Sequence, residues 1–362
     1  MTNGREPRPR YRLFGSIGSP YALKLRSLLR YKRLPFDWVP ATLDWIPVNL
    51  PHPPLCAAAN KEIASLKPPI VPAIYFPEDG SIRNESTTLA YLLDELNPHR
   101  PTIPTDPCLA FFSHLLEDMA DEWLVKIAFQ YRWGNAEDAA HKSRIVSGEF
   151  LGGDYPEEVL ESAAKHFAQR QQSRMPLVGC TPENAPLILG TFKRLLGPMN
   201  RLATSSTFIF GASPTLADFG FYGQLQSLAT DPTSWAVMRS FAPGLFSYLQ
   251  LLEDASGIEP VELRFDELGA PTIDILRYAA SIYLPYLAAN ELALANGQAV
   301  VSIRLEGDEF HQNTFRYHAK CYRLLKEEFN ALPREAHARA TQLLDRIGGY
   351  EYFATDTDRK GA

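Results

Sequence analysis

Cysteine is scarce in this chain: its 362 residues contain four. These lie far apart, at Cys56, Cys108, Cys180 and Cys321. They form no Cys-x-x-Cys pair and show no metal-ligand spacing. This pattern argues against a disulfide framework and a zinc site, and it is typical of free thiols in a reducing compartment. We therefore expect a cytoplasmic protein without a bound metal.

Long apolar runs and dense charge of one sign are also missing. No apolar run approaches the ~18 to 20 residues that a membrane span needs. The net charge is −6, and the one dense basic segment, Arg5–Arg12, lacks the apolar core of a secretory signal. An acidic chain of this kind is not typical of nucleic-acid-binding proteins. We expect neither a membrane nor a nucleic acid as a partner.

The first hundred residues predict a small α/β domain at residues 11–98. A β-prone segment, a segment with helical apolar spacing and a second β-prone segment come in that order, which favours parallel pairing of the two strands. A hairpin and a further helix follow. The expected strands are 11–14, 36–39, 72–76 and 81–83, and the expected helices are 23–31, 57–66 and 86–96.

Helical periodicity dominates after a proline-rich linker at residues 99–107. An all-α domain is predicted at residues 108–258, followed by a mostly helical extension at residues 259–353 that contains one strand-like segment, 298–304. The expected helices are 109–131, 157–172, 186–203, 215–230, 244–253, 272–294, 314–332 and 335–346.

Ser19 and Pro20 stand where the first predicted strand gives way to a helix. Ser is a favoured N-cap and Pro a favoured first helical residue, so this pair could serve only to begin the helix. The same geometry has a chemical use. A hydroxyl at the positive end of a helix can donate to a thiolate, and such surroundings lower a thiol pKa below its usual ~8.5. Both interpretations are open at this point.

Two further pairs carry the same ambiguity. Val71-Pro72 precedes a strand, either as a simple strand entry or as a cis bond that turns the Val71 backbone toward a peptide ligand. Glu85-Ser86 opens a helix. Ser86 would be its N-cap; alternatively, Ser86 and nearby backbone N–H groups would hold a carboxylate while Glu85 pairs with an ammonium.

These residues together carry a family resemblance. Residues 11–98 resemble the thioredoxin-like N-terminal domain of glutathione transferases, nearest to the omega-like and bacterial types. The resemblance extends to about residue 255, because Ser213-Pro-Thr215-Leu-Ala-Asp218 resembles the capping box of the family's all-α second domain. It implies a homodimer that uses glutathione as co-substrate and no metal. The implied catalytic residue is Ser19, and the implied glutathione-binding residues are Val71, Pro72, Glu85 and Ser86.

The chain departs from the family pattern in three places. Omega-type members have Cys where this chain has Ser19, which disfavours mixed disulfides and favours attack by the glutathione thiolate itself. Ordinary members lack the region from about residue 259 onward. The connection at residues 41–69 is longer than usual, at the wall expected near the glycyl end of glutathione.

The segment His114–Trp123 invites a competing hypothesis. Its carboxylates are spaced four apart, which suits half of a metal site, but no second segment supplies the missing ligands. A solvated or interdomain helix face is favoured, and His311, His318 and Cys321 are interpreted as structural. Aromatic residues are candidates for a substrate pocket, with core packing as the alternative: Tyr21, Trp123, Tyr131 and Trp133.

The sequence thus predicts a cytoplasmic detoxification enzyme of the glutathione transferase type. Ser19 would stabilise a glutathione thiolate that attacks a small apolar electrophile, by conjugation or by removal of a leaving group. The alternative is a non-catalytic protein of the same fold, whose extension makes a partner-binding surface.

Overall fold

The computed structural model describes residues 10–42, 50, 52–153, 155–205 and 208–354. Most of the basic segment Arg5–Arg12 and part of the 41–69 connection lie outside the described residues. Within the described ranges, no helix is both long and apolar enough to cross a membrane.

The first domain is built on a four-stranded sheet of order β2-β1-β3-β4. β1 pairs parallel with β2, and β3 pairs antiparallel with both β1 and β4. This confirms the predicted thioredoxin-like arrangement. Its elements are β1 (Tyr11–Gly15), α1 (Pro20–Tyr31), β2 (Phe36–Pro40), α2 (Ala57–Ile63), β3 (Ala73–Tyr75), β4 (Ile82–Asn84) and α3 (Ser86–Leu96).

Alternation along β1 gives the sheet two different buried faces, because successive strand residues point to opposite sides. Leu13 joins the core that contains α1 and α3, whereas Phe14 joins a small cluster with Ala59 and Ile63 of α2. α1 and α3 therefore lie on one face of the sheet and α2 on the other.

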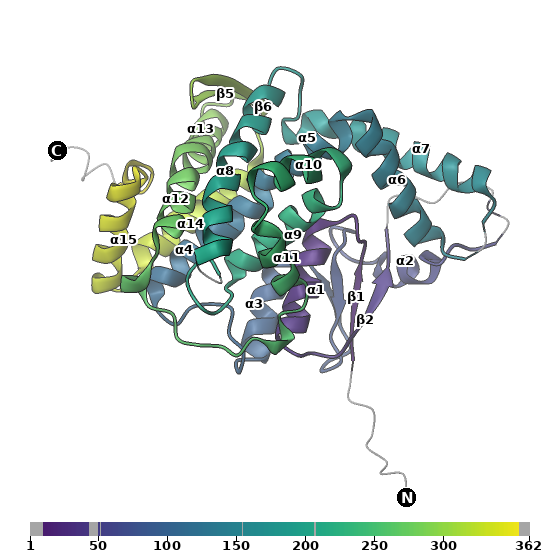
Figure 1. Ribbon diagram of the computed structural model, residues 1–362, viewed down its shortest axis with the longest axis horizontal. Helices are drawn as coiled ribbons and strands as arrows, with labels where there is room; N and C mark the ends of the chain where they lie inside the picture. Colours follow the sequence, from purple (N-terminus) through teal and green to yellow (C-terminus); the bar gives the residue numbers. More distant parts are fainter. Residues whose placement is uncertain (1–9, 43–49, 51, 154, 206–207, 355–362) are drawn as a thin grey trace, which may run out of the picture.

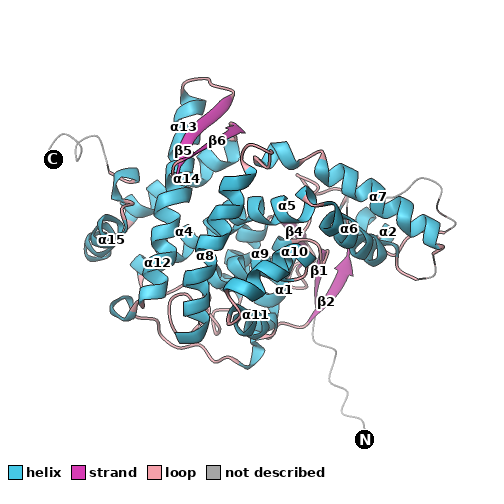
Figure 2. Ribbon diagram, turned by 45° about the horizontal axis from the view of Figure 1, so that its top comes forward, coloured by secondary structure: helices cyan, strands magenta, loops and turns pink. Residues whose placement is uncertain are grey.

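The rest of the chain is mostly helical, which confirms the expected all-α domain and extension (Figures 1 and 2). The helices up to Gly257 are α4 (Pro107–Met119), η1 (Ala120–Leu124), α5 (Val125–Gly134), α6 (Ala136–Leu151), α7 (Glu157–Gln172), η2 (Met175–Val178), α8 (Ala185–Ser205), α9 (Leu216–Ala229), α10 (Pro232–Phe241), α11 (Leu245–Glu253) and η3 (Ala255–Gly257). The later elements are η4 (Phe265–Glu267), α12 (Ala270–Tyr278), η5 (Ala279–Tyr283), α13 (Leu284–Ala295), β5 (Val300–Leu305), β6 (Asp308–Asn313), α14 (Arg316–Ala331), α15 (Arg334–Ile347) and η6 (Tyr350–Tyr352).

The capping box predicted for the second domain is confirmed. The Thr215 N–H and hydroxyl both donate to the Asp218 carboxylate, which also accepts the N–H of Ile209. Burial raises the pKa of Asp218 to about 6, and these hydrogen bonds act in the opposite direction. α9 therefore begins at a defined residue and runs through the centre of the molecule.

Several elements were not expected from the sequence: α6, α10 and β6, besides the short helices η2, η3, η4 and η6. α6 has its larger apolar residues only in its second half, although Asn135 caps it by accepting the N–H groups of Glu137 and Asp138. α10 is short. β6 is mostly polar and forms a hairpin with the predicted strand β5, which places His311 on a strand.

The extension packs onto the second domain through one continuous hydrophobic core. Buried Tyr283 donates a hydrogen bond of 2.6 Å to Asp118, and His114 lies 2.7 Å from Glu328. Since the same core also contains residues of the first domain, the boundaries proposed at residues 98, 107 and 258 stay a prediction.

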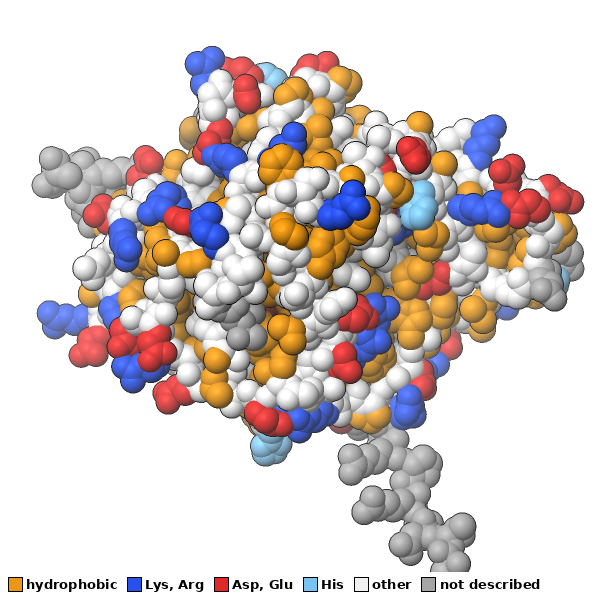
Figure 3. Space-filling model, viewed as in Figure 1, with side chains coloured by type: hydrophobic (Ala, Val, Ile, Leu, Met, Phe, Trp, Pro, Cys, Tyr) orange, Lys and Arg blue, Asp and Glu red, His pale blue; other side chains and the backbone are white. Residues whose placement is uncertain are grey.

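The α6–α7 hairpin lies beside α2 of the first domain (Figure 1). The N–H groups of Leu55 and Cys56 donate to the carbonyls of Leu151 and Phe150. Gly152 follows α6 with φ +62°, and a Cβ there would lie 2.7 Å from the Cβ of Leu55. A larger residue would separate the two segments. On the face seen in Figure 3, acidic and basic side chains are interspersed with apolar ones.

Candidate functional site

The three motifs singled out in the sequence meet at one edge of the sheet. Ser19 follows the carboxyl end of β1, and Glu85 follows the carboxyl end of β4. Val71 precedes the amino end of β3, which is antiparallel to both strands. The sheet topology therefore brings together three segments, of which the first and last, Ser19 and Glu85, are 66 residues apart in the chain.

Ser19 is the N-cap of α1, with Pro20 as the first helical residue. Its hydroxyl oxygen accepts the N–H of Ala22 at 3.3 Å. Among the described residues, no acceptor for the Ser19 hydroxyl proton is found. The side chain thus stands at the positive end of a helix with its proton available to a ligand.

The loop before Ser19 is held by the second domain. Glu149 of α6 accepts hydrogen bonds from the Ser16 hydroxyl at 2.7 Å, from the Ile17 N–H and from the indole N–H of Trp38 at 3.0 Å. Arg132 of α5 donates to the Gly18 carbonyl at 2.8 Å. Burial raises the pKa of Glu149, and its three hydrogen-bond donors act against that rise. These contacts fix the loop that carries Ser19.

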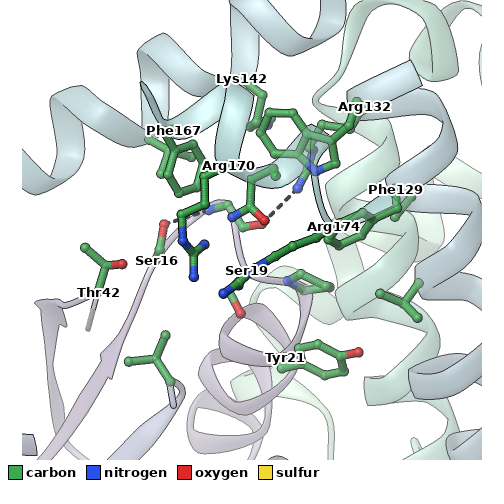
Figure 4. Close-up of a pocket in the computed structure, with 18 of the residues that line it drawn as sticks. Ser16, Ser19, Tyr21, Thr42, Phe129, Arg132, Lys142, Phe167, Arg170 and Arg174 are labelled. Carbon is green, nitrogen blue, oxygen red and sulfur yellow. Dashed lines mark hydrogen bonds between the residues drawn. The ribbon is translucent and has the colours of Figure 1, made fainter. Parts of the chain in front are cut away.

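A cavity of about 290 Å³ opens between the two domains at this loop. The first domain contributes Ser16, Ser19, Tyr21, Thr42 and Val71. The second domain contributes an apolar wall and four basic side chains (Figure 4). The apolar wall is Val125, Ala128, Phe129, Trp133, Val146, Phe150 and Phe167, and the basic side chains are Arg132, Lys142, Arg170 and Arg174.

Two of the cavity's hydroxyl protons are engaged within the protein. Ser16 donates to Glu149, and Tyr21 donates to the Asp121 carbonyl at 3.0 Å. Burial, together with the charge of Glu122, raises the pKa of Tyr21. Neither group is placed to give its proton to a thiolate without losing an internal hydrogen bond, in contrast to Ser19.

Val71 and Pro72 directly precede β3, and the bond between them is cis. Val71 is half-buried and lines the cavity. Within the described parts of the chain, its backbone N–H and C=O make no hydrogen bond, so an extended ligand backbone could pair with them.

Glu85 and Ser86 lie at the start of α3, and neither lines the cavity. The expected N-cap is wrong by one residue: Glu85 is the cap, and its carboxylate accepts from the Thr88 N–H at 2.9 Å. Glu85 has φ +79°, a conformation that is strained for a side chain with a Cβ. Ser86 is buried, with its hydroxyl 3.5 Å from the Asp121 carboxylate.

The surroundings of Glu85 are acidic. The charge of Glu85 contributes to raising the pKa of Glu122, after burial, to about 7. The pKa of Tyr317, on α14 of the extension, is also raised by burial and by the charges of Glu122 and Glu85. This region is therefore one in which an ammonium group would be favoured.

A buried ion cluster joins the first domain to the second beneath these residues. Lys24 of α1 bonds Glu117 of α4 and lies 2.7 Å from the carboxylate of Asp121. Burial alone would lower the pKa of Lys24, but Asp121 and Glu117 raise it. The sequence analysis favoured a solvated or an interdomain helix face for the segment His114–Trp123. Its carboxylates Glu117 and Asp121 are buried between the domains, so the interdomain interpretation holds for them.

Two of the aromatic pocket candidates lie away from the cavity. Trp123 is fully buried and packs with Tyr286 and Phe310 of the extension. Tyr131 packs with Phe192 of α8. Both sit in the main core, because α4, η1 and α5 form one central helical segment that turns these rings toward the extension and α8. Tyr21 and Trp133 do line the cavity.

Sequence reasoning missed Glu149, Arg132, Arg170 and Arg174. The spacing of Phe167 and Arg170 along the predicted helix 157–172 was a local signal for Arg170, whereas Arg174 lies beyond the end of that helix. For Glu149 no local signal exists, because its partner Ser16 is 133 residues away. Across the described residues, no group of three or more His, Cys, Asp or Glu is arranged to hold a metal ion.

No model of a known protein family matches the chain, and neither does any curated protein. Solved structures with a similar fold include two glutathione S-transferases and a beta-etherase. That of Methylobacterium radiotolerans JCM 2831, in complex with glutathione sulfonate, is 18% identical, with a match covering 72% of this chain and 100% of that chain (TM-score 0.39). That of Methylobacillus flagellatus KT, with GSH bound, is 20% identical over 69% of this chain and 100% of that chain (TM-score 0.39).

The beta-etherase of Sphingobium sp. strain SYK-6 is 17% identical, with 66% of this chain and 93% of that chain covered (TM-score 0.42). Similarity at this level does not assign a ligand or an activity to this chain, so both have to be inferred from the residues of its own site. By its own sheet order and element sequence, the chain has a glutathione transferase fold.

Proposed function

We propose that this protein is a glutathione transferase in which the glutathione thiolate attacks a small electrophile with an apolar body. The observation that carries the proposal is the position of Ser19. It caps α1 in the wall of an interdomain cavity, and it is the cavity serine whose hydroxyl proton is not engaged by a described residue. A hydroxyl donor and a helix N-terminus both favour the thiolate over the thiol.

The reaction requires no group beyond glutathione and the electrophile. The sulfur electron pair forms a bond to carbon, and the leaving group departs with the electron pair of the broken bond. Where the electrophile is an epoxide or an activated alkene, the carbon–oxygen or π-bond pair takes up a proton from solvent. The thiol proton is released to solvent when the thiolate forms. The chain's own contribution is to bind, orient and lower the pKa of the thiol.

Glutathione would lie along the edge of the sheet. Its cysteinyl backbone would pair with Val71 beside Pro72, and its glutamyl carboxylate would meet Ser86 at the N-terminus of α3. Its ammonium would lie in the acidic region around Glu85 and Glu122. The homodimer and the cytoplasmic location expected from the family resemblance and the cysteine pattern belong to the same proposal.

Substitution of Ser19 tests the proposal. For Ser19→Ala we expect turnover of an aryl halide to fall by about tenfold or more, with glutathione affinity in calorimetry unchanged within about twofold, because the hydroxyl acts on the thiolate and not on the peptide. Loss of the N-cap costs ~1 kcal/mol of stability, so Ser19→Gly, which keeps most of the capping preference, is the matched control for folding.

Two outcomes would count against this assignment. Equal turnover of Ser19→Ala and the parent would move the role to another group, such as Ser16 or Tyr21. Glutathione binding without turnover of aryl halides, epoxides, β-aryl ethers or hydroperoxides would support the non-catalytic alternative. Ser19→Cys should gain thiol-disulfide exchange, because a cysteine at a helix N-terminus becomes nucleophilic.

A further inference from the structure

A chain of three hydrogen-bonded side chains links the extension to the acidic region beside Glu85. A carboxylate oxygen of Glu122, in η1, lies 2.7 Å from Nε2 of His318, and Nδ1 of His318 lies 2.7 Å from the hydroxyl of Tyr286. His318 is in the first turn of α14, which packs against α4 (Figures 1 and 2). His318 and Tyr286 both belong to the extension and are buried. The extension therefore holds a carboxylate of the second domain.

The direction of these hydrogen bonds follows from the charge of each group. Burial lowers the pKa of His318, so its ring is neutral and carries one proton. Burial raises the pKa of Tyr286, so its hydroxyl keeps its proton. An ionised carboxylate can only accept, so Nε2–H of His318 donates to Glu122, and Nδ1 accepts the proton of Tyr286. The hydrogen bond from His318 thus orients the carboxylate without neutralising its charge.

Glu122 forms no ion pair with a described lysine or arginine. Its Oε2 accepts from His318, whereas its Oε1 has no partner among the described residues, and the side chain is 15% exposed. Lys126 is the cation with the largest effect on the pKa of Glu122, but its ammonium donates to Gln312 and to the Val178 carbonyl. Burial raises the pKa of Glu122 to about 7. A cation bound at Oε1 would relieve this unfavourable burial of charge.

Glu122 lies beside the proposed position of the glutamyl end of glutathione. The carbonyl of the preceding residue, Asp121, accepts the hydroxyl of Tyr21, and its carboxylate is 3.5 Å from the hydroxyl of Ser86. Consecutive residues of a helix point in different directions, so Asp121 meets the first domain and Glu122 meets the extension. After burial, the charge of Glu122 is the largest cause of the raised pKa of Tyr21, which lines the cavity. The charge of Glu85 in turn acts on Glu122, so this carboxylate is near both the cavity wall and the start of α3.

Given the proposed function, we infer that the extension completes the glutathione site: Oε1 of Glu122 accepts the glutamyl ammonium, and His318 is the positioning residue that fixes this carboxylate. Tyr286 fixes the ring tautomer that supplies the N–H of His318. Interpreted from the sequence as structural, His318 thereby takes part in binding. Loss of its N–H leaves the charge of Glu122 in place but frees the carboxylate to turn away from the ammonium.

Calorimetry with two peptides tests this role. Glutaryl-cysteinyl-glycine differs from glutathione only in lacking the ammonium group. The parent should bind glutathione about tenfold more tightly than the analogue, the scale for a hydrogen bond between charged groups. Glu122→Gln should remove this preference, and His318→Leu should reduce it to about threefold or less, with the affinity for the analogue unchanged within about twofold. His318→Gln should restore most of it, because its amide N–H can replace Nε2–H.

His311→Leu is the matched control, because it makes the same substitution at an exposed position of the extension, and it should change neither affinity. Equal losses for both peptides in His318→Leu would overturn the inference, since damage to the fold affects the two alike. If His318→Leu does not fold, Tyr286→Phe, which removes only a hydroxyl, should reduce the preference at least about twofold. An unchanged preference in Tyr286→Phe would then overturn the inference.

The same measurements separate this inference from the proposed function. Equal binding of both peptides by the parent would overturn the inference and leave the proposed function intact. The expected preference without turnover of any electrophile would refute the proposed function and support the inference. Binding of neither peptide would refute both.

Discussion

Removal of the buried ammonium of Lys24 should destabilise the protein strongly. The side chain of Lys24 is 0% exposed, and those of its partners Glu117 and Asp121 are 1% and 8% exposed. Lys24→Met keeps the length of the side chain and removes its charge. Two carboxylates of the second domain then face an apolar chain at the interface with the first domain.

The size of this destabilisation follows from the two carboxylates, Glu117 and Asp121, that stay buried when the ammonium is removed. Breaking a buried ion pair by removing one partner typically costs about 3–5 kcal/mol, because the other charge is left without compensation. Here two carboxylates lose their cation, although Thr87 still donates to Glu117 at 2.7 Å. We expect the free energy of unfolding at pH 8 to fall by about 3–5 kcal/mol.

The loss of unfolding free energy caused by Lys24→Met (the deficit) should be smaller at low pH than at high pH. Burial raises the pKa of Asp121 to about 8, and Lys24 opposes that rise. At pH 5, well below this value, the Asp121 carboxyl is protonated in the parent and in the variant, so only the loss of the Glu117 ion pair is felt there. A carboxylate whose folded-state pKa is raised stabilises the fold at low pH and loses that contribution as the pH rises through the folded-state value. The deficit at pH 5 should therefore be less than half of that at pH 8.

Urea unfolding followed by circular dichroism at both pH values measures this effect. Lys320→Met, at an exposed position on α14, is the control and should change stability by no more than about 0.5 kcal/mol. Adding Glu117→Gln to Lys24→Met should recover at least about 1 kcal/mol, because one uncompensated charge is gone. A deficit below about 1 kcal/mol at pH 8, or an equal deficit at both pH values, would refute the reasoning.

Two further predictions concern packing and pH. A Cβ on Gly223 of α9 would lie 2.3 Å from the carbonyl oxygen of Pro20, so Gly223→Ala should lower the free energy of unfolding by about 1–3 kcal/mol. The control is Gly190→Ala, where a Cβ would meet nothing within 4 Å, and it should raise the melting temperature slightly. Equal effects of the two substitutions would contradict the close approach of Gly223 to Pro20. Burial opposes protonation of His114, but Glu328 raises its pKa to about 9. This raised pKa contributes stability below about pH 6.5 that is lost as the pH rises through about 9. His114→Gln should therefore cost about 1–2 kcal/mol at pH 7, reduced because Glu328 is 43% exposed, and almost nothing at pH 10. A deficit that does not change with pH would rule out this pairing.

Local sequence determined the elements and the places where they begin. Ser19 with Pro20 and Thr215 with Asp218 mark helix starts correctly, because a cap is a contact between residues three or fewer apart. The strand-helix-strand order sets parallel pairing of β1 and β2, and the topology then places Ser19, Val71 and Glu85 at one edge of the sheet. Short-range hydrogen bonding and chain connectivity are therefore sufficient to predict the helix starts and the place where the three motifs meet.

Even local prediction had limits where side chains compete for the same role. Glu85 and not Ser86 caps α3, because a backbone with φ +79° turns the Glu85 carboxylate back onto the Thr88 N–H. No propensity predicts such a conformation for a glutamate. The sequence did not predict β6, because most of its residues are polar and show no strand-like apolar pattern. β6 is a strand because it pairs with β5.

Tertiary structure alone decided the chemistry of the cavity. Glu149 reaches Ser16 across 133 residues, and Arg132 reaches Gly18 across 114. Lys24 has the sequence context of an exposed helical lysine but is buried, because α1 packs onto α9 and the Lys24 ammonium pairs with Glu117 of α4. Which side chain meets which depends on how the helices pack, and packing is set by summed contacts of the whole core, so no single segment of the sequence carries that information.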